Sequence, residues 1–176
     1  MKKTINRNRR IVLAGGVLGG VALLAPDLAR AEKWITSNVI KDKKTSFPFV
    51  LSDEEWKKRL SPEAYRILRE HGTERAGSSS LNHEKRNGVY HCAGCDAPVF
   101  SSKTKFESGT GWPSFYAPID PAAVGTSTDF KLIVPRTEVH CARCGGHLGH
   151  VFRDGPPQTG KRYCLNGAAL TFKPAS

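Results

Sequence analysis

The chain has 176 residues, enough for one domain with a tail, and a formal net charge of +11. Residues 1–31 hold six Lys or Arg against one Asp, whereas the remainder holds 21 against 15 Asp or Glu. The basic excess over the body is therefore moderate, and no basic run after residue 31 is long enough to predict a nucleic-acid patch. We therefore expect no nucleic-acid partner.

Residues 1–31 have the pattern of an export signal. Five Lys or Arg residues precede an apolar stretch, residues 11–25, that is too short to span a bilayer comfortably. Residues 29–31 form a small-x-small cleavage pattern, which predicts a mature chain that starts near Glu32. An arginine pair directly before the glycine-rich apolar stretch favours a twin-arginine signal over an ordinary secretory signal. We expect a periplasmic or otherwise exported protein with no stable membrane anchor after cleavage.

Two short helices are predicted after an irregular segment, residues 32–50, which we interpret as a linker or arm. Ser52 should cap the first helix, because a glutamate three residues later completes a capping box. Ser61 should begin the second, with Pro62 at its first position, and Gly72 should end it. The residues predicted to face the core are Trp56, Leu60, Ala64, Ile67 and Leu68.

The remainder of the chain, from Val89 onward, predicts short strands between Gly and Pro turns. The candidate strands are residues 89–91, 98–100, 130–134, 138–140, 148–152, 162–166 and 170–172. No alternation of strands with helices appears, so the connections favour antiparallel pairing. The expected fold is mainly β, with the helices packed at the N-terminal side of the sheets.

Four of the five cysteines form two CxxC pairs separated by 45 residues. Two such pairs suit a tetrahedral zinc ion, and four thiolates leave no open coordination position, which indicates a structural ion. Two alternatives are a redox disulfide pair, because exported proteins meet an oxidising compartment, and iron bound by the same ligands. The candidate metal ligands are Cys92, Cys95, Cys141 and Cys144.

The fifth cysteine, Cys164, is then the only free thiol. In a strand over 162–166, Tyr163 and Leu165 would face the core, and Arg162, Cys164 and Asn166 would share the other face. A neighbouring guanidinium favours the thiolate, which is the nucleophilic form. The alternative is that Cys164 is one more buried small hydrophobe. The odd thiol in an exported protein favours the reactive interpretation.

Four further side chains are candidates for a site around the free thiol. Trp112 lies in a Gly- and Pro-rich turn, where it could wall an apolar pocket for a group such as a methyl, or fold back into the core. His147 and His150 could exchange protons with the thiol, but a regular strand places them on opposite faces unless Gly149 permits a bulge. Either histidine could instead serve the metal site. Asp154 follows in a turn and could orient a histidine.

Together these segments resemble the peptide methionine-R-sulfoxide reductases. The most specific stretches are GWPSF, HLGHVF and RYCLN, and the resemblance runs over most of residues 51–172 in the family's order. The matching segments are residues 60–65, 72–75, 105–115, 147–156 and 162–166. We therefore interpret residues 51–176 as one reductase domain.

The resemblance implies a core of two antiparallel sheets with short N-terminal helices, held by one structural Zn²⁺ on the four paired cysteines. It implies that Cys164 is the nucleophile and that Trp112 receives the substrate methyl, with Phe115 and Asp154 as further substrate-binding residues. The remaining catalytic residues that it implies are His147, His150, Asn166 and Arg162.

The implied reaction is the thiol-dependent reduction of peptide- or protein-bound methionine-R-sulfoxide through a cysteine sulfenic acid. Oxidised exported proteins would be the substrates, and the chain is expected to act as a monomer. Many family members carry a resolving cysteine where this chain has Thr110, so an external thiol, such as a thioredoxin-like protein, is the expected reductant. The alternative function is an exported zinc-ribbon binding module without catalysis.

Overall fold

The computed structural model describes residues 47–130 and 134–175. The expected export signal and most of the expected linker lie outside these ranges. Residues 47–50, the described end of that linker, contact the domain: the Phe49 amide donates to the Arg143 carbonyl, and the Phe49 ring packs edge-on against Trp56. Within the described ranges, no helix has the length and apolar character needed to cross a bilayer.

The two predicted helices are confirmed as α2 (Asp53–Arg59) and α3 (Pro62–Glu70). The capping box at Ser52 is complete, and all five apolar residues predicted to face the core are buried. The predicted end of α3 needs one correction. The left-handed residue that ends the helix is His71, with φ 55°, and Gly72 follows it and donates its amide to the Arg66 carbonyl.

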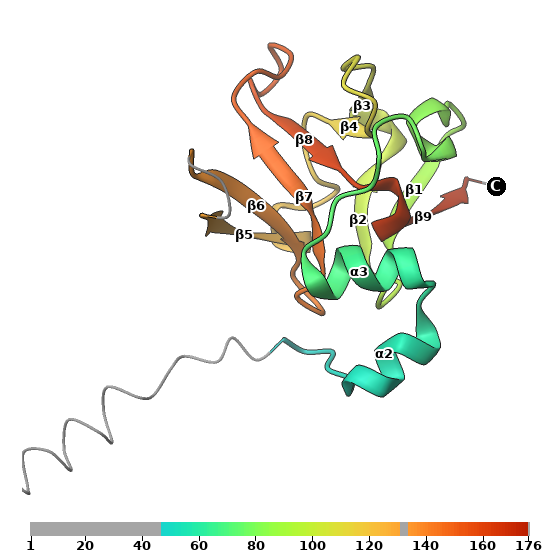
Figure 1. Cartoon of the computed structure of the whole chain (residues 1–176). Helices are drawn as coiled ribbons and strands as arrows, with labels where there is room; N and C mark the ends of the chain where they lie inside the picture. Colours follow the sequence, from blue (N-terminus) through green and yellow to red (C-terminus); the bar gives the residue numbers. More distant parts are fainter. Residues whose placement is uncertain (1–46, 131–133, 176) are drawn as a thin grey trace, which may run out of the picture. The chain divides into compact units, whose positions relative to one another are not determined.

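Two antiparallel sheets are present, as predicted, and in the described ranges they contain nine strands (Figure 1). The three-stranded sheet has the order β2-β1-β9, and the six-stranded sheet has the order β3-β4-β8-β7-β6-β5. The strands are β1 (Gly88–Cys92), β2 (Pro98–Ser101), β3 (Lys105–Phe106), β4 (Ser114–Phe115), β5 (Val124–Asp129), β6 (Arg136–Cys141), β7 (His147–Phe152), β8 (Arg162–Leu165) and β9 (Leu170–Pro174). α3 contacts β7 and the short 3₁₀ helix η4 (Gly167–Ala169), so it lies at the lower ends of both sheets in Figure 1.

The strand predicted over residues 130–134 is wrong. Phe130 and Val134 lie outside any strand and are exposed, and the residues between them are not described. The observed strand, β5, comes just before and has the polar sequence VGTSTD. It pairs only with β6 at the edge of the sheet, where a strand needs no apolar alternation. β3 and β4, two residues each, were not predicted either.

Aromatic rings from both sheets form the centre of the core. Phe115 of β4 packs against Tyr90 of β1 and Phe100 of β2, with ring centroids 4.9 and 4.8 Å apart. Phe115 is fully buried among these rings, so its interpretation as a substrate-binding residue is corrected to a core residue. The two faces of β8 are as predicted, with Tyr163 and Leu165 buried in the core.

A bulge in β7 places both predicted histidines on one side of the sheet. Val139 of β6 pairs with Gly149, but the next residue, His140, pairs with His147, so Leu148 is the extra residue in β7. The rings of His147 and His150 consequently lie 5.3 Å apart. Gly149 is required there, because a Cβ would lie 2.1 Å from the Cys164 carbonyl oxygen on the adjacent strand.

Candidate active site and metal centre

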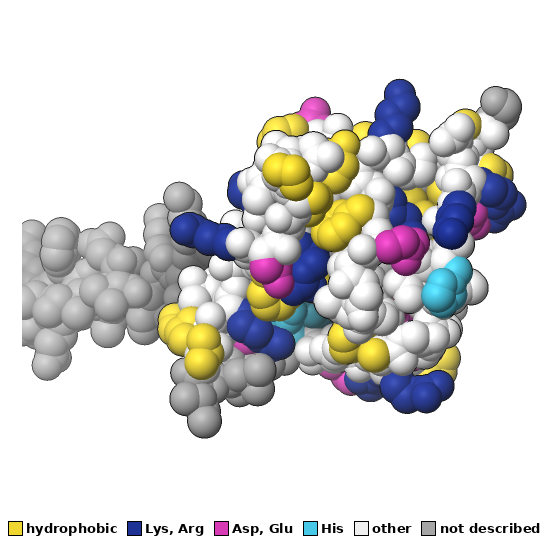
Figure 2. All heavy atoms as spheres, turned by 90° about the horizontal axis from the view of Figure 1, so that it is seen from above, with side chains coloured by type: hydrophobic (Ala, Val, Ile, Leu, Met, Phe, Trp, Pro, Cys, Tyr) yellow, Lys and Arg dark blue, Asp and Glu magenta, His cyan; other side chains and the backbone are white. Residues whose placement is uncertain are grey.

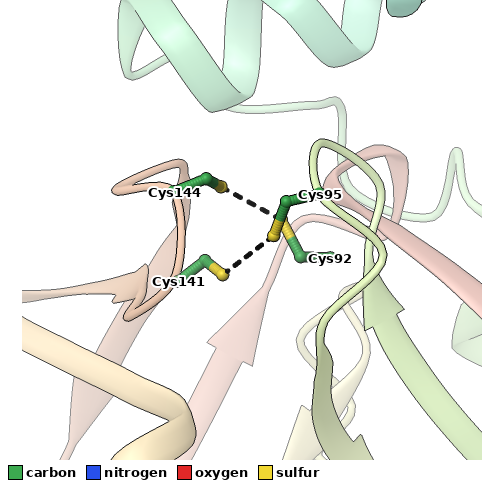
Figure 3. A group of neighbouring side chains, drawn as sticks. All are labelled: Cys92, Cys95, Cys141 and Cys144. Atoms are coloured by element: carbon green, nitrogen blue, oxygen red, sulfur yellow. Dashed lines mark hydrogen bonds between the residues drawn. The ribbon is translucent and has the colours of Figure 1, made fainter. Parts of the chain in front are cut away.

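The four paired cysteines meet at one point, where the turn after β1 faces the turn after β6 (Figure 3). The Sγ atoms lie within 4.8 Å of one another, with 3.7 Å between those of Cys92 and Cys144 and 3.5 Å between those of Cys95 and Cys141. The two turns have the same hydrogen bond, from the amide four residues on to the carbonyl of the first cysteine. The cluster therefore joins the three-stranded sheet to the six-stranded sheet.

The donor set fits a tetrahedral metal ion. Metal–sulfur bonds of about 2.3 Å in tetrahedral geometry place sulfur atoms about 3.8 Å apart, close to the spacing of these thiols. Hydrogen bonds from the neighbouring thiols raise the pKa of Cys92, with Cys141 as the largest contributor, and lower the pKa of Cys141, with Cys144 as the largest. Four buried thiols at this spacing cannot all ionise without a cation. The cluster has the ligands and the spacing to hold a metal ion, and all four predicted ligands belong to it.

A cavity of about 120 Å³ lies on the other face of β8, beside Cys164. On the face drawn in Figure 2, histidine side chains lie at the floor of a hollow bordered by basic and acidic side chains. The structure brings together four of the predicted site residues in this cavity and adds others that were not predicted. Its principal lining residues are Trp112, Arg136, His150, Phe152, Cys164 and Asn166.

Arg162 is held beside the thiol by two contacts. Its Nε and Nη2 donate to the two Asp154 carboxylate oxygens at 3.0 and 2.7 Å, and its guanidinium lies 4.6 Å from the centre of the Phe152 ring. Asp154 first, and the sulfur of Cys164 to a lesser degree, raise the pKa of Arg162. The sequence had suggested that Asp154 orients a histidine. In the structure it pairs with Arg162 instead.

The two histidines are oriented by carboxylates that the sequence did not identify. His150 Nε2 lies 2.7 Å from Asp129 Oδ2, and His147 Nδ1 lies 2.6 Å from Glu138 Oε1. An ionised carboxylate only accepts, so Nε2 of His150 is the donor and its Nδ1 is the basic nitrogen of the neutral ring. Burial lowers the pKa of His150, while His147 is the main cause that lowers the pKa of Glu138 to about 2. His147 is buried behind the cavity lining, whereas His150 reaches it.

Glu74 positions both the tryptophan and the end of β8. Its carbonyl accepts from Trp112 Nε1 at 3.3 Å, and its amide donates to Asn166 Oδ1 at 2.9 Å. Its buried carboxylate accepts from the amides of Gly167 and Ala168 at 2.7 and 2.8 Å. Asn166 is thereby fixed, because its Nδ2 also donates to the Leu148 carbonyl.

A chain of hydroxyl groups leads to the thiol. Ser114 Oγ donates to the Trp112 carbonyl, Ser108 Oγ lies 2.7 Å from Ser114 Oγ, and Thr110 Oγ1 lies 2.8 Å from Ser108 Oγ. Each hydroxyl has one proton, so Thr110 donates to Ser108 and is left as an acceptor for the Cys164 thiol at 3.8 Å.

The residues missed from the sequence are Asp129, Glu138 and Arg136. Asp129 ends β5, the strand that was not predicted, and Glu138 reaches His147 only through the β6–β7 pairing. Arg136 Nη2 pairs with Asp129 at 2.7 Å, and its buried Nε has no partner in the part of the chain that the structure describes. The sequence did contain one signal, the charged Glu138 in the predicted strand 138–140. That signal could be interpreted only once the pairing of β6 with β7 was known.

The fold and the cavity define a β domain with a four-cysteine cluster between its two sheets and one further thiol among histidine, arginine and tryptophan side chains. Comparison with known proteins agrees: the SelR domain model matches residues 60–174. The chain is 53% identical to the peptide methionine sulfoxide reductase MsrB of Agrobacterium fabrum over 70% of this chain and 91% of the relative. For the MsrB of Methanosarcina barkeri the values are 57%, 69% and 86%, and for the chloroplastic B1 enzyme of Arabidopsis thaliana 57%, 76% and 65%.

The chain belongs to the MsrB family of peptide methionine sulfoxide reductases, as its motifs had indicated. It is accordingly an enzyme, a peptide-methionine (R)-S-oxide reductase, and the alternative of a non-catalytic binding module is wrong.

The lowered pKa of His150 predicts a pH dependence of stability. Unfolded histidine titrates near its usual value of 6.5, whereas burial lowers the pKa of His150 in the folded chain. Between the two pKa values the unfolded state binds the extra proton, so the free energy of unfolding should fall as the pH falls through 6.5. The contribution of His150 to this slope is at most about 1.4 kcal/mol per pH unit, and it should be absent in His150→Asn.

Urea denaturation of both chains at pH 7 and pH 5 measures this difference. His83→Asn, which changes an exposed histidine, serves as the control and should keep the wild-type dependence. The same pH slope in His150→Asn and wild type would show that His150 takes up its proton equally in both states.

Proposed function

We propose that the enzyme reduces methionine-R-sulfoxide in peptides and proteins by direct attack of Cys164 on the sulfoxide sulfur. One observation carries the proposal: the only cysteine outside the metal cluster opens into a cavity that also contains His150 and Trp112. A cysteine sulfur is the strongest nucleophile that the chain offers.

The cavity has the parts that this substrate requires. The indole of Trp112, fixed by its bond to the Glu74 carbonyl, provides an apolar wall for the substrate methyl group. The buried Nε–H of Arg136 provides a donor for the sulfoxide oxygen in the same cavity. A methyl and an oxygen on one tetrahedral sulfur can therefore be told apart, which is the basis for selecting one epimer.

The proton balance assigns a role to His150. Its basic nitrogen takes the Cys164 proton, and the resulting imidazolium, stabilised by Asp129, returns that proton to the sulfoxide oxygen. Oxygen moves from the methionine sulfur to the cysteine sulfur, so Cys–SH and sulfoxide become Cys–SOH and sulfide. His147, held by Glu138, supports the His150 ring from behind, and Asn166 fixes the end of β8.

The metal ion is proposed to be zinc, with a structural role. The pattern of two CxxC pairs and the absence of an open ligand position support zinc. The ion would stabilise the fold and take no part in the reaction, because the cluster joins the two sheets and none of its four cysteines lines the cavity.

We expect one zinc per chain on these four thiols. Cys95→Ser should lower the free energy of unfolding, and its turnover should fall only as a consequence of this lower stability. Metal analysis of purified chain, with urea denaturation and a turnover assay for each variant, measures this. Folded, active protein without bound metal would exclude the zinc, and a loss of turnover in a variant of unchanged stability would exclude a purely structural role.

Export is proposed from residues 1–31, which have the basic start, short apolar stretch and cleavage pattern described above. The enzyme would then repair oxidised exported proteins, as a monomer without a membrane anchor. N-terminal sequencing of the exported fraction should show a mature chain that starts near Glu32. Gel filtration of that fraction should give the mass of a monomer. Full-length chain retained in the cytoplasm would contradict it.

The central test is turnover of the two epimers of a blocked methionine sulfoxide in a coupled assay. Wild type should reduce only the R epimer, and Cys164→Ser should remove this activity by several orders of magnitude, because a hydroxyl at this position is a far weaker nucleophile. Thermal unfolding should be unchanged, since Cys164 belongs to the cavity and not to the metal site. Wild-type turnover by Cys164→Ser would disprove the assignment.

The fate of the sulfenic acid can be tested in a single turnover. Thr110 cannot form a disulfide, and the remaining cysteines are the metal set, so a trappable Cys164 sulfenic acid should accumulate until an external thiol reduces it. Thr110→Cys is the matched control, because Thr110 Oγ1 lies 3.8 Å from Cys164 Sγ and a thiol there is within reach. Mass spectrometry should show a species two hydrogens lighter only in Thr110→Cys. The same species in wild type, with Cys164 linked to a cysteine of the metal set, would disprove external recycling.

A further inference from the structure

A second group of metal-ligating side chains lies on the six-stranded sheet, away from the four cysteines. His71 ends α3, Glu138 is in β6 and His147 is in β7, and one ligand atom from each lies within 4.8 Å of the others. We propose that these three residues form a second metal site, which binds a divalent transition-metal ion such as Zn²⁺ reversibly.

The geometry converges on a single oxygen. Glu138 Oε1 lies 2.8 Å from His71 Nδ1 and 2.6 Å from His147 Nδ1, while Glu138 Oε2 is held separately by the Ser127 hydroxyl at 2.6 Å. The carboxylate is therefore fixed with one oxygen directed at two imidazoles. The Nδ1 proton of each histidine can move to Nε2, which leaves Nδ1 able to bind an ion in place of its hydrogen bond to Glu138. Binding therefore requires no unfolding of the site.

The position of His71 is an independent observation. This residue has φ 55°, a left-handed conformation that a non-glycine residue seldom adopts, although glycine follows directly. The conformation brings its ring within 5.3 Å of the His147 ring. A left-handed residue is a common way to end a helix, and here the residue in that position carries an imidazole that reaches the His147 ring.

The site is accessible to an ion and to its water ligands. A cavity of about 190 Å³ is lined by all three residues together with Thr128, Asp129 and Phe130. The His71 side chain is 47% exposed, whereas that of Glu138 is 11% exposed. Three protein ligands plus water is a common arrangement for exchangeable zinc.

The chemistry of the ligands selects the class of ion. Two imidazoles and one carboxylate suit zinc, cobalt, nickel or copper, whereas magnesium and calcium prefer oxygen ligands only. Asp129 adds a negative charge to the cavity, although Arg136 pairs with it and reduces its attraction for a cation. Binding should therefore be exchangeable, unlike that at the buried four-cysteine cluster.

Occupancy would affect the reaction through His150, whose ring is 5.3 Å from that of His147. An ion on His147 would hold in place the ring that packs against His150, so its binding should alter the turnover that the proposed mechanism assigns to His150. Only this consequence depends on the proposed function, and the ion itself binds regardless.

The test is calorimetric titration of Zn²⁺ into the full chain with Cys164→Ser, its cysteine cluster already loaded with zinc. This background removes the active-site thiol as a competing ligand. One further equivalent should bind. His71→Asn should weaken it at least about 10-fold, since asparagine tolerates the left-handed backbone but provides a poor ligand. His83→Asn, which changes an exposed histidine elsewhere, should bind as the parent does.

Absence of a further equivalent, or undiminished binding by His71→Asn, would overturn the proposal. Co²⁺ titration provides a second measurement, because ligation by nitrogen and oxygen gives no thiolate charge-transfer band. Such a band would place the ion in the cysteine cluster and would also overturn it. Added Zn²⁺ should reduce wild-type turnover more than that of His71→Asn. A chain that binds the ion but has no turnover at all would count against the proposed function and not against this site.

Discussion

The buried carboxylate of Glu74 is the constraint on which the arrangement of the active site depends. A carboxylate removed from water destabilises a fold unless it is hydrogen-bonded, and here two consecutive amides of η4 donate to it. The same residue binds Trp112 through its carbonyl and Asn166 through its amide. Segments about 40 and 90 residues away in sequence are thus fixed to one point. Trp112 in the cavity and β8, which carries Cys164, are therefore fixed relative to each other.

The separation of metal and thiol chemistry follows from where the two sheets meet. The paired cysteines lie at the ends of β1 and β6, one strand from each sheet, so an ion there resists their separation. Cys164 lies in the middle of the six-stranded sheet, between β4 and β7, with its side chain on the cavity face. Four of the five cysteines therefore lie where an ion could join the two sheets, and the fifth lies apart from them beside the cavity.

Local patterns predicted the parts of this structure that depend on near neighbours. The capping box at Ser52, the two faces of β8 and the CxxC pairs are each set within a few residues, and all were predicted correctly. The carboxylates that orient the histidines were not, because Asp129 and Glu138 reach them across strands whose register no local pattern fixes. Phe115 was misplaced for a similar reason. It lies in the same segment as Trp112, but the pleat of β4 directs it into the core.

The position of β8 and β9 in the sequence has a consequence for how the chain folds. β8 is an inner strand of one sheet, and β9 pairs with β1 across about 80 residues, from Gly88 to Pro174. Both strands follow the other seven in the sequence, so neither sheet can close until β8 and β9 have been synthesised. Contacts of such long range slow folding, and until they form β7 and β1 present unpaired edges to other chains. The thiol of Cys164, carried by β8, therefore enters its cavity only after the strands on either side of it, β4 and β7, have been synthesised.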